Sequence, residues 1–213
     1  MKSAAIAAAI VGVVLSTAPG RAHQVREPQA LDASQPIPYF IADGIGRTGY
    51  RPGDRELASW ALAAWQRQAG TSLRLVAGPE STSIVRLYWA NARDGQYGEM
   101  RPFVVGGRGG AAVYIRPDMD GLGPEIAQRA AQDDLLRESI VYLTCLHELG
   151  HALGLAHTAA FDDIMYFFGY GGDIVEYFGR YRRQLRSRGD IARVGGLSDA
   201  DIKRLRSLYP PRP

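Results

Sequence analysis

Three histidines that could bind a metal ion lie within the stretch LHELGHALGLAH, residues 146–157. His147 and His151 are four residues apart, so on a helix their side chains lie one turn apart on the same face. Gly154 follows three residues later and can adopt the left-handed conformation that ends a helix. The chain can then turn back and bring His157 to the same point. This spacing predicts a metal site made of the three histidines.

Three neutral imidazole ligands with an open fourth position are typical of a catalytic zinc ion, whereas structural zinc sites usually have four protein ligands. Imidazole also suits copper, iron and nickel, so the assignment to zinc is an inference from the pattern. Glu148 follows the first histidine and would lie beside the metal without binding it. There it can act as general base toward a zinc-activated water, which makes a peptide bond the natural target. The alternative is a set of ordinary core histidines beside an accidental glutamate.

The segment HELGHALGLAH resembles the extended zinc signature of the metzincin endopeptidases, H-E-x-x-H-x-x-G-x-x-H followed by a methionine turn. Met165 lies eight residues after His157 and is followed by Tyr166, a spacing that is similar to the matrixin branch. The closing LSDADIKRLRSLY resembles the C-terminal helix of matrixins. More loosely, ELASWALAAWQRQAGTSLRL resembles their first helix and second strand. The resemblance covers most of residues 37–210.

The resemblance implies a zinc-dependent endopeptidase that hydrolyses internal bonds of protein or peptide substrates. It implies one catalytic Zn²⁺ with the ligands His147, His151 and His157, and with Glu148 as catalytic general base. Met165 would form an apolar floor below the metal. Tyr166 either helps to shape the site or is purely structural.

Substrate contacts and two rival functions stay open at the level of sequence. In the family an upper edge strand pairs with extended substrate, and either Phe103–Val105 or Ala111–Ile115 could be that strand. One rival is a zinc-binding interaction module without productive catalysis, although the intact Glu148 argues against it. The other is a zinc hydrolase of a non-peptide amide.

Several features of matrixins are missing from this chain. His23 is the one remaining histidine, so no structural zinc is predicted. Asp94, Asp118 and Asp120 are too scattered to form a calcium cage, so no calcium is predicted either. Cys145, the single cysteine, excludes an internal disulfide and is expected to pack in the core on the helix face opposite the histidines.

Hydrophobic periodicity and turn residues predict the elements that position the site. Strands are expected at 37–43, 71–78 and 83–90, and a hairpin is expected around the glycine-rich turn that joins Phe103–Val105 to Ala111–Ile115. Helices are expected from a cap at Asp54 to about Gln68, at 124–134 either separate or joined to the next, at 135–154, at 173–193, and after a cap at Ser198 with Asp201 at its third position. Strands that precede helices predict an α+β fold, in metzincins a mixed twisted sheet with a zinc-binding helix and a C-terminal helix.

The N-terminal residues predict export. Lys2, the apolar run of residues 4–15 and the small residues before His23 are typical of a signal peptide over residues 1–22, cleaved near Ala22. We therefore expect a secreted, extracellular or periplasmic protein, with a flexible leader at 23–36 and a single domain at 37–213. Loss of Lys2 and Arg21 lowers the formal charge from +3 to +1, which gives no reason to expect nucleic acid. A monomer without a stable membrane anchor is predicted.

A helical insertion near residues 169–195 also departs from the matrixin pattern, and Phe167 replaces the proline that follows the methionine turn. The insertion carries five closely spaced arginines, Arg180, Arg182, Arg183, Arg186 and Arg188. They form either a solvated helix face or a patch that prefers acidic substrates or an anionic surface. In relatives this region forms the wall of the pocket for the residue after the cut, so specificity cannot be transferred from the family.

Overall fold

A five-stranded mixed sheet forms one layer of the domain. The computed structural model describes residues 28–45, 48–91 and 97–211, and the strand order is β2-β1-β3-β5-β4. The parallel strands are β1 (Ile37–Ile41), β2 (Leu75–Ala77), β3 (Val85–Trp89) and β5 (Arg108–Ile115), and β4 (Gly98–Val105) runs antiparallel to β5. The predicted hairpin is confirmed. Of its two strands, β4 with Phe103–Val105 lies at an edge of the sheet and β5 lies inside it.

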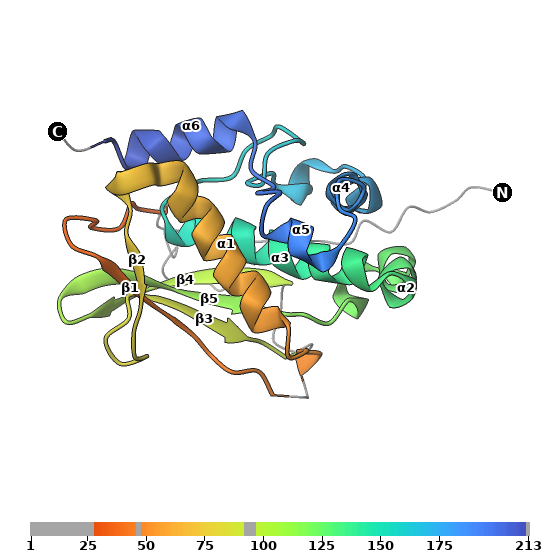
Figure 1. Cartoon of the computed structure of the whole chain (residues 1–213), viewed down its shortest axis with the longest axis horizontal. Coiled ribbons are helices and arrows are strands. Elements are labelled where there is room, and N and C mark those ends of the chain that lie inside the picture. Colours follow the sequence, from red (N-terminus) through yellow and green to blue (C-terminus); the bar gives the residue numbers. More distant parts are fainter. Residues whose placement is uncertain (1–27, 46–47, 92–96, 212–213) are drawn as a thin grey trace, which may run out of the picture.

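The helices form the second layer and lie on one side of the sheet (Figure 1). They are α1 (Asp54–Ala69), α2 (Pro124–Gln132), α3 (Asp134–Ala152), α4 (Ile174–Arg182), α5 (Arg188–Ile191) and α6 (Asp199–Leu208), with single 3-10 turns at Gly70–Ser72, Asp120–Leu122 and Phe168–Tyr170. The α+β fold is thus confirmed. Among the described residues, no helix combines the length and apolar character that a membrane crossing requires.

Two helix boundaries settle or correct the sequence predictions. Asp133 is extended and its side chain accepts a hydrogen bond from Leu136 N, so α2 and α3 are separate helices. The pattern at 173–193 contains two helices, α4 and α5, instead of one. Ser187 and Asp190 form a capping box that starts α5, and such reciprocal bonds favour a new helix start over continuation of the previous one.

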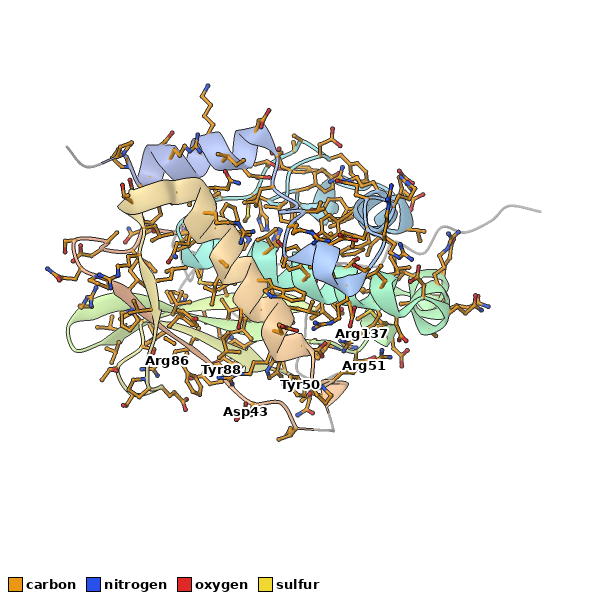
Figure 2. All side chains as sticks on the ribbon, viewed as in Figure 1. Asp43, Tyr50, Arg51, Arg86, Tyr88 and Arg137 are labelled. Atoms are coloured by element: carbon orange, nitrogen blue, oxygen red, sulfur yellow. The ribbon has the colours of Figure 1, made fainter. Side chains whose placement is uncertain are left out.

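Strand β3 shows how the sheet separates its two faces. Val85, Leu87 and Trp89 are buried toward the helices, whereas Arg86 and Tyr88 project from the opposite face, as Figure 2 shows. This alternation is the period of two that the sequence predicted. The core therefore lies between the sheet and helices α1 and α3.

Helix α1 is fixed against α3 by two buried polar contacts. The indole nitrogen of Trp65 donates to Leu146 O at 2.9 Å. The predicted cap role of Asp54 is wrong, because Gly53 occupies the cap position and makes no side-chain cap bond. Asp54 instead accepts hydrogen bonds from both terminal nitrogens of Arg137 on α3, the Nη2–Oδ2 distance being 2.8 Å. Asp54 Oδ2 also accepts from Arg51 N, just before the helix, at 2.8 Å. The carboxylate therefore joins the start of α1 to a buried cation of α3, and each charge compensates the other where water cannot reach.

The Asp54–Arg137 pair gives the first prediction. Both side chains are almost fully buried, with exposed fractions of 1% and 3%. Asp54→Ala should lower the free energy of unfolding by about 3–5 kcal/mol, because it leaves the Arg137 charge buried without its counter-charge, with only the carbonyl oxygens of Gly49 and Pro117 as acceptors. The measurement is urea unfolding followed by tryptophan fluorescence.

Glu125→Ala is the matched control for this experiment. It breaks the exposed Arg129–Glu125 pair and should cost no more than about 1 kcal/mol. Equal losses of unfolding free energy in the two variants would show that the buried pair stabilises the fold no more than an exposed pair does.

Candidate metal centre

Helix α3 and the turn after it bring the three histidines together. His147 and His151 lie on the last turns of α3, which ends at Ala152 with Leu153 as its cap. Gly154 has φ of 96°, a conformation that side chains other than glycine's rarely adopt. The chain reverses there and carries His157 back to the helix, as the sequence predicted. One ligand nitrogen from each of the three rings lies within 4.8 Å of the other two.

Backbone carbonyls orient two of the rings. His147 Nδ1 lies 2.6 Å from Ile164 O, and His151 Nδ1 lies 2.8 Å from Leu155 O. Because a carbonyl oxygen can only accept, each Nδ1 must carry the hydrogen and each Nε2 must keep its lone pair. A carbonyl on the far nitrogen is also the usual second partner of a metal-bound histidine. The two rings therefore present their free nitrogens to a common point.

The Nε2 atoms of the three rings are placed where they could hold a cation. His147 Nε2 is buried and has no hydrogen-bond partner within the described residues. His151 Nε2 lies 3.0 Å from His157 Nε2, a distance at which His157 can donate a hydrogen to His151 or both nitrogens can bind one metal ion. Burial, followed by the neighbouring histidines, lowers the pKa of His147 well below its usual value and that of His157 to about 4. Neutral imidazoles are the form that binds zinc.

Glu148 lies beside this point and is buried, with an exposed fraction of 4%. Burial, and to a smaller extent the charge of Glu99, raises the pKa of Glu148 to about 8. A divalent cation next to it would oppose that effect and favour the carboxylate. In either state the group is placed to take up or release a proton.

Two glycines allow other side chains to approach closely around the site. A Cβ on Gly98 of β4 would lie 2.5 Å from Glu148 Oε1, and a Cβ on Gly150 of α3 would collide with the sulfur of Met165. Met165 is fully buried against this part of α3, which is consistent with its predicted place below the metal. Nothing in the sequence marked Gly98, whereas Gly150 lies inside the signature itself.

The loop that carries Met165 is anchored by α6. Asp201 accepts from Ile164 N at 2.8 Å, and Ile164 O is the acceptor for His147. The predicted capping box of Ser198 and Asp201 is confirmed, but its second role in holding this loop was not foreseen. The sequence lacks a signal for it, since the partners are 37 residues apart.

Asp163, on the same loop, accepts hydrogen bonds from Ser198 Oγ, Thr158 Oγ1 and Arg204 Nη2 at 2.6, 2.9 and 2.6 Å. Burial alone would raise the pKa of Asp163, but these three bonds outweigh it and hold the pKa below its usual value. The loop is therefore fixed by charge-assisted bonds as well as by packing.

The other residues that the sequence singled out pack in the core or bond to neighbouring groups. Cys145 is fully buried, as expected. The Tyr166 hydroxyl donates to Gly171 O at 2.9 Å, so this side chain braces the loop. The ring of Phe167 lies 4.9 Å from that of His157. Asp94 lies outside the described residues, and Asp118 forms an ion pair with Arg116.

Most of the arginines at residues 180–188 pair with acidic side chains of the same molecule. Four of the five form ion pairs, namely Arg180–Asp162, Arg182–Asp133, Arg183–Glu176 and Arg188 with both Glu56 and Glu138. The side chains of Arg182 and Arg188 are only about a third exposed, and both tie the 169–195 region to other helices. These pairs favour a structural interpretation over a patch that prefers acidic substrates.

Residues 28–36, the described part of the predicted leader, contact the domain near the histidines. Leu31 N donates to the Tyr209 hydroxyl at 2.9 Å, and Arg108 Nη2 donates to Asp32 O at 3.3 Å. A Cβ on Gly154 would lie 2.5 Å from Ala30 N. The predicted boundary between the leader and the domain, after residue 36, stays a prediction. Residues 28–32 line the same groove as β4 and His151.

The mixed sheet, the histidine-bearing helix α3 and the C-terminal helix define a metzincin-type domain. The chain matches the model of the matrixin family over residues 55–172, more than half of its length. The protein therefore belongs to the matrixin family, a metalloprotease family whose members bind zinc. A comparison with curated proteins gave no match.

Metal binding gives the second prediction. The purified chain should bind one zinc ion and gain thermal stability from it, because a ligand that binds only the folded state stabilises that state. His151→Ala should abolish both effects, because only two imidazole ligands would remain and two are too few to hold the ion. The measurements are metal analysis after dialysis and the melting temperature with and without zinc.

His23→Ala is the control in full-length protein, because it removes the one histidine outside the cluster. Zinc binding that survives His151→Ala but is lost in His23→Ala would place the metal elsewhere.

Proposed function

We propose that this protein is a secreted zinc-dependent endopeptidase that cleaves internal peptide bonds of proteins. The observation that carries the proposal is the convergence of three neutral imidazole nitrogens, one of them buried and without a hydrogen-bond partner in the described part of the chain, beside a buried carboxylate. Membership of the matrixin family supports it. Secretion is supported by the signal-like residues 1–22, which lie outside the described residues.

In this proposal His147, His151 and His157 hold the zinc, and their carbonyl partners keep each ring in place. Zinc bound there would supply Lewis acidity toward water and toward the scissile carbonyl. Glu148 accepts a proton at its carboxylate from the attacking water and returns it to the leaving amine. Its burial keeps bulk water away from that carboxylate and strengthens its electrostatic effect.

Strand β4 is the element we propose for substrate binding. It is the edge of the sheet, and an extended peptide can add to an edge strand through main-chain hydrogen bonds. Gly98 lies at the start of β4 and next to Glu148, so a peptide along β4 passes the proposed catalytic base. Sequence alone left β4 and β5 as equal candidates, and the inner position of β5 favours β4.

The third prediction tests catalysis. Residues 23–213 should cut unfolded casein at internal bonds, and activity should vanish on chelation and return with zinc. Glu148→Gln keeps the shape of the side chain but provides no carboxylate to take up a proton, so kcat should fall by about 10²–10⁴-fold. The measurement is mass spectrometry of the products, together with the initial rate.

The rival functions have distinct outcomes in the same assay. Stoichiometric zinc with equal inactivity of the wild type and Glu148→Gln would favour an interaction module. Hydrolysis of small amides without cleavage of any peptide in a mixed library would favour the non-peptide hydrolase.

The fourth prediction concerns Gly98. Gly98→Ala should displace the Glu148 carboxylate, because the added Cβ would lie 2.5 Å from Oε1. We expect kcat/KM to fall about 10²-fold, with zinc content unchanged. Gly109→Ala on β5 is the matched control, since its Cβ would meet nothing within 4 Å. A Gly98→Ala enzyme as active as the control would show that the position of Glu148 is not limiting.

A further inference from the structure

A small recess opens beside the proposed catalytic residues. It lies between the start of β4, at Tyr97 and Gly98, and the face of α3 that carries His147 and Glu148. Its remaining walls come from the loop after the metal site and from α4, through Tyr177 and Phe178. A substrate side chain next to the bond being cut would enter here, because Glu148 lines the recess.

The wall from α4 is held firmly in place. The Tyr177 hydroxyl donates to Asp163 O at 3.0 Å and lies 3.3 Å from Ile164 O, the same loop that orients His147. The Phe178 ring packs edge-on against Tyr177 at 5.3 Å between centroids and is only 4% exposed. This wall lies beyond residue 172, where the match to the family model ends. It is therefore supplied by residues that the family match does not include.

The recess offers little polar contact away from its mouth. Thr144 Oγ1 donates to Ile140 O at 2.8 Å, and the Tyr97 hydroxyl points to the Met119 sulfur at 3.5 Å. Tyr177 is bonded as described above. An acidic side chain that entered would lose its hydration and would face the Glu148 carboxylate instead of an opposite charge.

The recess is also small. Its volume is about 30 Å³. A methyl group would fit this space as it stands, whereas an isobutyl or aromatic side chain would have to displace part of the wall. Larger groups would have to move Phe178, which is buried and packs against Tyr177.

We propose that α4 restricts the substrates of this enzyme to those with a small uncharged residue, such as alanine, next to the cleaved bond. Phe178 is the specificity-determining residue. This inference rests on the proposed endopeptidase function and adds its substrate class. Leucine, phenylalanine and glutamate at that position are disfavoured, the first two by size and the third by desolvation.

The fifth prediction tests this with a synthetic peptide library and wild-type residues 23–213. Mass spectrometry of the cut sites should show alanine enriched at one of the two positions that flank the cut. In matched peptides that differ only there, alanine should exceed leucine in kcat/KM by at least about tenfold. Phe178→Ala should bring the two within about twofold by raising the rate for leucine, and Phe178→Leu should give an intermediate ratio.

Leu185→Ala is the matched control, because it removes a buried side chain from the same region without lining the recess. It should keep the wild-type ratio. Binding to Glu148→Gln, measured by calorimetry with the same peptides, should show the same order without any turnover. This binding measurement tests the size preference even if the Phe178 variants do not fold.

The outcomes separate the two proposals. An active wild type that cuts equally well beside leucine, or a Phe178→Ala ratio unchanged from that of the wild type, would overturn the inference and leave the endopeptidase standing. No cleavage by the wild type beyond that of Glu148→Gln would overturn both.

Discussion

Each of two histidines uses one ring nitrogen to donate a hydrogen bond to a backbone carbonyl, and the arrangement of the site depends on this. Ile164 O and Leu155 O fix the tautomers of His147 and His151, so their other nitrogens can only offer lone pairs. Lone pairs that face one another repel unless a cation lies between them. The loop at Ile164 must therefore be fixed in space, and Asp201 on α6 does this through the Ile164 amide.

Helix α3 connects this local arrangement to the rest of the domain. Its N-terminal half is joined to α1 by the buried Asp54–Arg137 pair, and its C-terminal half by the bond from Trp65 to Leu146 O. Small residues at Gly98 and Gly150 then allow β4 and Met165 to approach the helix closely. Part of the core, two of the three clustered histidines and the proposed catalytic base thus lie on one helix, so its placement affects all three.

The region after residue 172 shows how a family site can be modified without change to its ligands. Helix α4 packs on the same loop that orients His147, through Tyr177, and closes the recess beside Glu148. Its arginines form ion pairs with acids of the domain, among them Arg182 with Asp133 at the start of α3. Charge pairing of this kind positions the helix, while its aromatic side chains face the site.

The sequence by itself indicated the group of three histidines that could hold a metal, Glu148 beside it, the helix that carries most of these residues and the order of most elements, because these depend on spacings of a few residues along one helix or turn. Met165 was found the same way, by its distance from His157. Only the tertiary structure decided that β4 is the edge strand, that Asp54 pairs with Arg137, and that Gly98, Asp201 and Phe178 contribute to the site. Asp54, Gly98 and Asp201 are 37 or more positions away from the partners they contact in α3 or the metal-site loop. The role of Phe178 depends on how α4 packs. Contacts between distant segments depend on packing of the whole chain, which local periodicity does not encode.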